Sequence, residues 1–204
     1  MPIDIKSLGV DLMSITAHKM YGPKGIGALY VRRGRPRPKL EALFDGGGHE
    51  NGLRPGTVNV PGAVGFGAAA EICREEMTSE SRRVSHLRDR LLGGLTENLS
   101  GVTVNGSMRY RLPHSLNVSF DCLEGESLLL ALGDIAVSSG AACASANPKP
   151  SHVLHAIGVS EERARASIRF GLGRSTSEAQ VDYVIGKVVS IVNRLRELSP
   201  YASR

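Results

Sequence analysis

The strongest periodic pattern of apolar and polar residues lies near the end of the chain. Seven apolar residues recur there at helical spacing: Val181, Val184, Ile185, Val188, Val189, Val192 and Leu195. Ser177 and Gln180 precede them with the spacing of a capping box, in which each side chain bonds the other residue's backbone amide. The pattern predicts an amphipathic helix that begins after Ser177 and packs one face against a core.

A longer helical pattern runs from residue 61 to residue 99, with small residues first and mixed charges later. Gly93 and Gly94 weaken the predicted helix near its end. Five charged residues are expected on its solvent-facing side: Arg82, Arg83, Arg88, Asp89 and Arg90.

Short apolar runs between turn-forming residues predict the strands. They cover residues 10–16, 26–31, 102–104, 115–120, 135–138 and 166–172. Short helices are predicted at residues 126–132 and 151–157, the second with Ser151 as its N-cap. The glycine-rich stretch from residue 46 to residue 57 predicts an ordered loop without helix or strand.

The order of these elements predicts an α/β protein in two parts. From residue 61 onward, helices and strands alternate as in a complete small α+β domain, residues 61–204. Residues 1–60 supply two strands and loops, which do not make a domain by themselves. We expect these residues to belong to a larger sheet.

Composition narrows the class of protein. Hydrophobic residues make up 41% and charged residues 22%, as in ordinary globular proteins. No run approaches the ~18 consecutive apolar residues of a membrane helix, and the first residues lack a signal-peptide pattern. We therefore expect a cytoplasmic protein that does not contact a membrane. The net charge of +5 is scattered without interleaved aromatic residues, which argues against nucleic-acid binding.

The cysteines argue against a disulfide framework and against a structural zinc site. There are three of them, an odd number, and no two have CxxC spacing. Cys143 lies among small residues from Ser138 to Ala146, where we expect an exposed loop whose thiol a partner can reach. Cys73 lies in the predicted long helix and is expected to be buried in the protein core. Cys122 ends a predicted strand and has no assigned role. Four histidines lack carboxylate or cysteine neighbours at ligand spacing, which predicts no metal site: His49, His114, His152 and His155.

Lys19 is a candidate Schiff-base lysine. It follows His18 at the end of an apolar strand and precedes a glycine-rich turn, where its amine would be partly desolvated. Desolvation lowers the pKa of an amine and makes it a better nucleophile. The alternative is an ordinary surface lysine.

Three more residues have side chains suited to binding anions. Arg169 lies inside an apolar strand, where a buried guanidinium needs an anionic partner such as a substrate carboxylate. The alternative is an arginine on the open face of an edge strand. Thr16 and Thr57 adjoin histidine-containing or glycine-rich loops and could bind phosphate, or could be turn residues.

Several segments, taken in order, resemble the cysteine desulfurases, which are pyridoxal-phosphate (PLP)-dependent enzymes. The segments are Ala17-His18-Lys19, Tyr21-Gly22-Pro23-Lys24-Gly25, Gly46-Gly47-Gly48-His49-Glu50, Arg54 with Gly56-Thr57, Glu124-Gly125-Glu126-Ser127-Leu128, Ser138-Ser139-Gly140 with Ala142-Cys143, and Ser167-Ile168-Arg169-Phe170. The match runs from Pro2 to Pro200. The cysteine segment is similar to that of the long-loop class that feeds iron–sulfur cluster assembly. Selenocysteine lyase is a close alternative.

The resemblance implies a PLP-dependent transferase of fold type I. Residues 1–60 would be the C-terminal part of the large PLP-binding domain, and residues 61–204 the small domain with the cysteine loop. Lys19 would hold PLP as a Schiff base, with Thr16, Ala17 and His18 in the same cofactor site and Thr16 at the phosphate. Thr57 would reach the phosphate of the neighbouring subunit in a homodimer.

The resemblance also implies the chemistry. Arg169 would clamp the carboxylate of L-cysteine. Cys143 would attack the substrate's sulfur and become a persulfide, leaving L-alanine. The sulfur would pass to an acceptor or an iron–sulfur scaffold protein, with Cys143 as a transient cluster ligand and no intrinsic metal site.

The chain departs from the family in three ways. It has Pro55 where the family usually has serine and Ala144 where threonine is common. Family members also carry about as many residues again upstream, including the acid that pairs with the pyridine nitrogen of PLP. We therefore expect the C-terminal half of such an enzyme: a truncated product, a split partner or a partial sequence. A non-catalytic remnant acting as an interaction module is the alternative.

Overall fold

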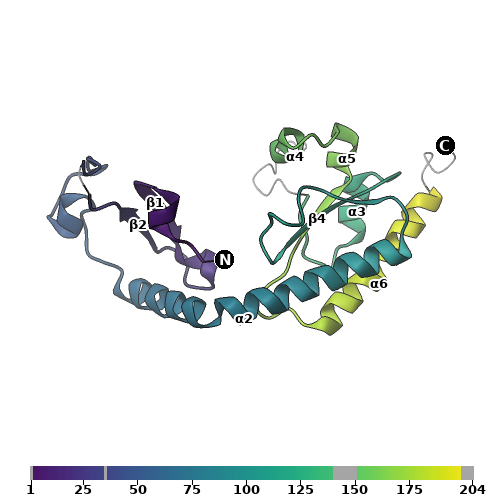
Figure 1. Cartoon of the computed structure of the whole chain (residues 1–204), viewed down its shortest axis with the longest axis horizontal. Helices are drawn as coiled ribbons and strands as arrows, with labels where there is room; N and C mark the ends of the chain where they lie inside the picture. Colours follow the sequence, from purple (N-terminus) through teal and green to yellow (C-terminus); the bar gives the residue numbers. More distant parts are fainter. Residues whose placement is uncertain (1, 35, 140–150, 199–204) are drawn as a thin grey trace. The chain divides into compact units, whose positions relative to one another are not determined.

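The computed structural model describes residues 2–34, 36–139 and 151–198 (Figure 1). The chain forms two compact units, the first ending at Thr78 and the second beginning at Ser79. The division falls inside the long helix α2 (Val60–Asn98), whereas the sequence pattern predicts that the small domain begins at residue 61. No helix in the described ranges is both long enough and apolar enough to cross a membrane.

The first unit is built around a two-stranded antiparallel sheet. Its elements before α2 are α1 (Ile5–Leu8), β1 (Leu12–Thr16), η1 (Ala17–Met20), β2 (Gly27–Val31) and η2 (His49–Gly52), where η denotes a 3-10 helix. The strands pair from Leu12 with Val31 to Thr16 with Gly27. Gly27 is required by this pairing, because a Cβ atom there would lie 2.7 Å from the carbonyl oxygen of Ile15.

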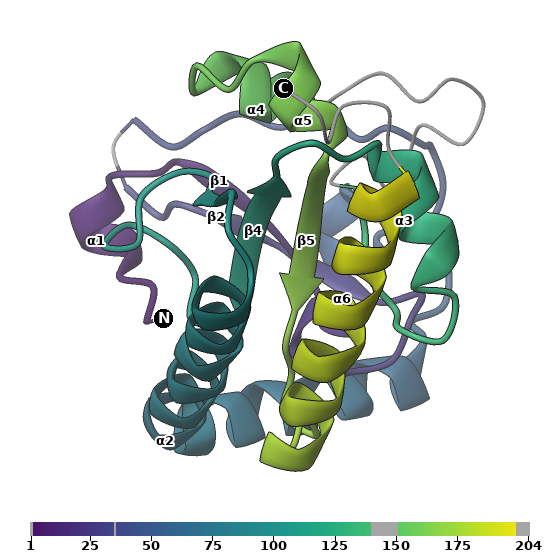
Figure 2. The same ribbon diagram turned by 90° about the vertical axis from the view of Figure 1, so that its right-hand side faces the viewer.

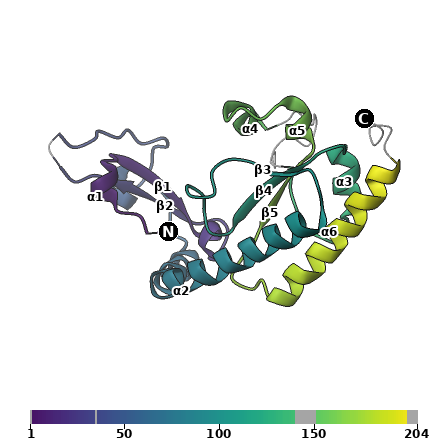
Figure 3. The same cartoon turned by 45° about the vertical axis from the view of Figure 1, so that its right-hand side comes forward.

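The second unit is a three-stranded antiparallel sheet with helices. Its elements after α2 are β3 (Val102–Val104), β4 (Ser115–Phe120), α3 (Gly125–Ala131), α4 (His152–Ala156), α5 (Glu161–Arg165), β5 (Ser167–Gly171) and α6 (Glu178–Leu198). The strand order is β3-β4-β5 (Figure 3). The predicted strands 102–104 and 115–120 are confirmed with the same bounds.

The hydrophobic core of this unit lies on one face of the sheet. Alternate residues of β4, Leu116, Val118 and Phe120, are fully buried there because side chains of a strand alternate between its two faces. Helices α2 and α6 cover that face side by side (Figure 2). They contribute most of the remaining core: Val84, Leu87, Leu91, Leu95, Val181, Val188, Ile191 and Val192.

The capping box of α6 is confirmed. The backbone amide of Ser177 donates to Gln180 Oε1 at 2.9 Å, and the amide of Gln180 donates to Ser177 Oγ at 3.2 Å. Two backbone donors that the helix itself cannot satisfy are thus paired at its first turn.

The predicted strand at residues 135–138 is wrong. The chain turns after α3, and the amide of Ile135 donates to the carbonyl of Leu132 at 2.6 Å. The amide of Ile135 is therefore not available to pair with a neighbouring strand. Only Ser138 pairs with the sheet, through an isolated bridge to Arg169. Ile135 and Val137 of this run instead pack against the core.

Several local predictions are also wrong. Arg88 is buried, not solvent-facing, because its guanidinium donates to Asp89 Oδ1 at 2.8 Å and 2.9 Å and to the carbonyl of Pro113 at 3.4 Å. Ser151 does hold the predicted N-cap position of α4, although its side chain makes no capping hydrogen bond. Residues 49–52 form the short helix η2, in which Glu50 and Asn51 have left-handed backbone angles.

Two short helices, α1 and α5, are not predicted by the sequence pattern. In α1 the side chain of Asp4 accepts from the amides of Lys6 and Ser7, and in α5 that of Ser160 accepts from the amide of Arg163. Helices this short show no periodicity, so only their capping residues could have revealed them.

Candidate functional site

The turn that carries Lys19 follows directly from β1. The strand ends at Thr16, and Ala17 begins the helix η1 fully buried. The amide of Gly22 donates to the carbonyl of Ala17 at 2.9 Å, and Tyr21 has a left-handed backbone with φ of 64°. The backbone on both sides of Lys19 is therefore held in one conformation.

Helix α2 supports this turn within the first unit. A Cβ atom at Gly22 would lie 3.0 Å from Ala17 Cβ and 3.1 Å from Ala69 Cβ, so glycine permits the close approach of helix and turn. Cys73, also on α2, places its Sγ 3.7 Å from the carbonyl oxygen of Met20. The residue after Lys19 is therefore in contact with the helix.

The side chain of Lys19 is available for reaction. It is exposed, so the predicted partial burial is wrong, and it forms no hydrogen bond or ion pair within the described part of the chain. It lines a concavity of about 530 Å³ together with Thr16 and six more residues: Ile3, Ile5, Met13, Ser14, Ile15 and Met20. An amine and a hydroxyl thus share one mostly apolar hollow.

Thr16 and His18 are joined by a hydrogen bond of 2.8 Å between Oγ1 and Nδ1. A hydroxyl has a single proton to donate. Thr16 can therefore donate to an anion only when His18 Nδ1 carries a proton and donates to Thr16. His18 acts on the hollow through Thr16, because its own side chain does not line it.

Thr57 lies in the exposed stretch between η2 and α2. Arg54 Nη1 donates to the carbonyl of Gly56 at 2.9 Å and to that of Thr57 at 3.3 Å. These contacts involve the backbone only, and Thr57 as a residue is exposed.

Arg169 lies in β5 of the second unit, on the sheet face opposite the core. It is exposed and forms no ion pair with a described residue, which agrees with the open-face alternative. Its register partner in β4 is Asn117. On its other side, Arg169 N donates to Ser138 O at 2.7 Å, and Ser138 N donates to Arg169 O at 3.2 Å.

Cys143 lies outside the described residues, as does the rest of the segment from residue 140 to residue 150. Of the other cysteines, Cys73 is half-buried, and Cys122 is exposed with a left-handed φ of 63°. Among the described residues, no three or more His, Cys, Asp or Glu side chains gather as metal ligands.

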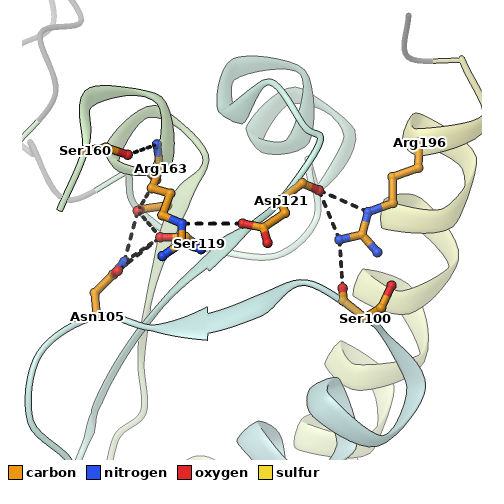
Figure 4. A network of polar contacts seen from close by, with 8 residues as sticks. Ser100, Asn105, Ser119, Asp121, Ser160, Arg163 and Arg196 are labelled. Carbon is orange, nitrogen blue, oxygen red and sulfur yellow. Dashed lines mark hydrogen bonds and ion pairs between the residues drawn. The ribbon is translucent and has the colours of Figure 1, made fainter. Parts of the chain in front are cut away.

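Sequence reasoning missed a buried polar network of Asn105, Ser119 and Ser167 (Figure 4). Ser167 lies on the same face of β5 as Arg169, because side chains alternate along a strand. Asn105 Nδ2 lies 2.6 Å from Asn117 Oδ1, 2.8 Å from Ser119 Oγ and 3.0 Å from Ser167 Oγ. Ser167 Oγ in turn donates to the carbonyl of Arg163 at 2.7 Å. The polar alternation of Ser115, Asn117 and Ser119 along the predicted strand is the signal that could have found it.

Ion pairs and backbone contacts fix the end of β4 beside this network (Figure 4). Asp121 Oδ1 lies 3.6 Å from Arg163 Nε in α5. Arg196 Nη2 in α6 donates to the carbonyls of Ser100 at 2.9 Å and of Asp121 at 3.0 Å. Residues of α5 and α6 thus both contact Asp121 at the end of β4.

Known proteins match both the sequence and the fold. A cysteine desulfurase IscS of Anaeromyxobacter sp. (strain Fw109-5) is 58% identical over 200 residues, which cover 98% of this chain and 49% of the relative. A solved structure described as a NifS-like protein matches with a TM-score of 0.83 and 36% identity, covering 96% of this chain and 50% of that one. Another, described as SspA in complex with cysteine, matches with a TM-score of 0.60 and 34% identity over 83% and 46% of the two chains. The chain spans about half the length of the curated relatives it matches.

The match extends to a whole family. The sequence profile of the aminotransferase class-V family covers residues 1–184, which include Thr16, Lys19, Thr57 and Arg169. Residues 1–184 span both compact units. This chain belongs to the aminotransferase class-V family.

Proposed function

We propose that this chain forms part of a cysteine desulfurase and contributes its cofactor lysine, its sulfur-accepting cysteine and its substrate-binding arginine. The observation that best supports this proposal is the backbone pairing of Arg169 with Ser138. Ser138 lies five positions before Cys143 in the sequence. A group that binds the substrate carboxylate thus adjoins the start of the segment that bears the thiol. The 58% identity to a relative of that name supports the same function.

The residues of the first unit fit PLP, on which enzymes of this family depend. PLP has an aldehyde and a phosphate. Lys19 offers an amine without a partner among the described residues, and Thr16 offers a hydroxyl in the same hollow. A volume of about 530 Å³ lies within the usual range for small-molecule sites, about 300–1,000 Å³. Bound PLP supplies an electron sink for the breaking of bonds in the substrate.

Each residue has a distinct part in the proposed reaction. Lys19 holds the cofactor, Thr16 donates to its phosphate, and His18 Nδ1 donates to Thr16 so that the threonine proton is free for that bond. Arg169 binds the carboxylate of L-cysteine through charge-assisted hydrogen bonds. One similar solved structure is described as a complex with cysteine, which favours this substrate.

Cys143 takes the sulfur. Its thiolate attacks the sulfur of the substrate, a sulfur–sulfur bond forms, and the carbon–sulfur bond breaks. The carbon keeps the electron pair and takes a proton, which gives L-alanine and a persulfide on Cys143. Thiol exchange then passes the outer sulfur to an acceptor or an iron–sulfur scaffold protein.

The remaining assignments follow from this function. Residues 1–60 form part of the large PLP-binding domain, and residues 61–204 form the small domain. In a homodimer, Thr57 reaches the cofactor phosphate of the neighbouring subunit, which suits the exposure of this residue. A free thiol at Cys143 suits a reducing compartment such as the cytoplasm.

Turnover of L-cysteine tests the proposal. The protein as its gene encodes it is supplied with PLP, L-cysteine and a thiol reductant, and alanine and sulfide are measured. We expect both products in equal amounts, none with Lys19→Ala, and unchanged amounts with Lys24→Ala, a matched exposed lysine. A parallel assay replaces L-cysteine with selenocysteine, and alanine from selenocysteine alone would assign the protein to selenocysteine cleavage. PLP binding without any turnover would identify a non-catalytic remnant.

A further inference from the structure

Asn117 is the cross-strand neighbour of Arg169. The two residues pair in the register of β4 and β5. Both lie on the face opposite the core, because Leu116, Val118 and Ile168 beside them are buried in the core. Directly opposed residues of an antiparallel pair have Cβ atoms about 4.5–5.5 Å apart. Side chains at these two positions can therefore bind one small group together.

The buried network determines which end of the Asn117 amide is available. Asn105 is only 6% exposed, and its Nδ2 lies 2.6 Å from Asn117 Oδ1. Contacts with Ser119 and Ser167 hold Asn105 in place. The carbonyl oxygen of Asn117 thus has a partner, whereas its amide nitrogen has none among the described residues. That nitrogen carries two protons to donate.

We propose that Asn117 is a second binding residue for the substrate carboxylate and that Asn105 orients it. The amide of Asn117 donates to one carboxylate oxygen while Arg169 binds the group from the adjacent strand. Both side chains present donors, and Arg169 forms no ion pair with a described carboxylate. The ligand class is the α-carboxylate of an amino acid, so the inference rests on the proposed function.

The variant Asn117→Asp isolates this role. Aspartate keeps the oxygen that accepts from Asn105 and replaces only the outward-facing donor by a second acceptor. The new carboxylate would pair with Arg169 and repel the carboxylate of the substrate. We expect KM for L-cysteine to rise more than tenfold and kcat to stay within about threefold. Asn193→Asp, the same change at an exposed position of α6, should leave both constants unchanged.

A second readout needs no turnover. The protein is labelled with ¹⁵N and titrated with L-alanine, and with alaninol, which lacks the carboxylate. We expect the side-chain amide signal of Asn117 to move with L-alanine only, and the signal of Asn193 to stay still. Movement with neither compound, or equal movement with both, would overturn the inference.

The two readouts separate the two claims. Cysteine turnover with an unchanged KM in Asn117→Asp would overturn the role of Asn117 and leave the desulfurase assignment standing. Absence of cysteine turnover in the parent would count against the desulfurase assignment. The titration would then decide the carboxylate site by itself.

Discussion

Arg169 and Ser138 exchange two backbone hydrogen bonds, 2.7 Å and 3.2 Å long. The strand residue that presents the guanidinium therefore also anchors the chain immediately before residues 140–150. A carboxylate held by Arg169 would place the rest of a small amino acid near the start of the segment that contains Cys143.

Replacing Arg169 with alanine should weaken substrate binding and spare the cofactor. We expect KM for L-cysteine to rise at least tenfold, which corresponds to about 1.4 kcal/mol, because a charge-assisted contact with the carboxylate is lost. The absorbance of bound PLP should be retained, since Lys19 and Thr16 belong to the other unit. Arg194→Ala, at an exposed position of α6, is the control. Loss of the PLP spectrum with normal cysteine binding would make Arg169 a cofactor or structural residue instead.

The persulfide should form on Cys143 and on neither of the other cysteines. Cys73 is half-buried against the carbonyl of Met20. Cys122 is exposed but lies in the turn after β4, beyond the register pair of Asn117 and Arg169. After a single exposure to L-cysteine, alkylation and peptide mapping should find the extra sulfur on Cys143. Cys143→Ser should abolish the labelled peptide, whereas Cys122→Ser should preserve it. Sulfur on Cys122 or Cys73 in the parent protein would contradict the assignment.

The two adjacent glycines of α2 should respond oppositely to alanine. A Cβ atom at Gly94 would lie 2.5 Å from Ile185 Cδ1 and 2.9 Å from its Cγ2, so the whole side chain of Ile185 must move. We expect Gly94→Ala to lower the free energy of unfolding by about 1–3 kcal/mol. Gly93→Ala meets nothing closer than Glu97 Oε1 at 3.8 Å and should raise it by about 0.5–1 kcal/mol.

Urea denaturation of both variants measures the effect, and a double variant identifies its cause. Gly94→Ala combined with Ile185→Ala should cost less than the sum of the single changes, because the clash is removed. Additive costs would show that Gly94 is not constrained by the contact between α2 and α6.

Stability should depend on pH through Asp134. Hydrogen bonds from Lys187 and then from Tyr183 hold the pKa of the Asp134 carboxyl below its ordinary value. A carboxyl whose pKa is lower in the folded state stabilises the fold above its unfolded pKa, about 3.9, and this contribution is lost as pH falls through the folded pKa. Asp134→Asn should therefore be less stable than the parent at pH 7, and this difference in stability should be smaller near pH 2.

Denaturation at the two pH values checks this prediction. The control is Glu97→Gln, which removes an exposed carboxylate without a partner among the described residues. A stability difference for Asp134→Asn that is the same at both pH values would show that the charge of Asp134 does not contribute.

The sequence predicts a helix or strand well where apolar residues recur at regular spacing or where a capping pair marks the start of a helix. The spacing of Ser177 and Gln180 marks the start of α6, and the alternation of Leu116, Val118 and Phe120 marks β4. Tertiary contacts decide the rest. Ile135 lies in a run of apolar residues typical of a strand, but its backbone amide donates to the carbonyl of Leu132 in a turn. Arg88 is buried because Pro113 and Asp89 accept hydrogen bonds from its guanidinium.

The site follows the same division. Lys19, Thr16 and Arg169 stand in recognisable motifs, so the sequence alone could nominate them. Asn117 becomes a candidate binding residue only through its pairing with Arg169 and its contact with Asn105, which is twelve positions away in the chain. The polar alternation along β4 places Asn117 on the face away from the core, but it does not show that Asn105 is its partner.

Reduction with borohydride tests the central claim most directly, because it makes the bond between PLP and its lysine permanent. The protein as its gene encodes it is loaded with PLP, reduced, digested and mapped by mass spectrometry. We predict that the pyridoxyl group lies on Lys19, that Lys19→Arg abolishes the labelled peptide, and that Lys24→Arg leaves it unchanged. A pyridoxyl group on another lysine of the loaded protein, with Lys19 unmodified, would contradict the account.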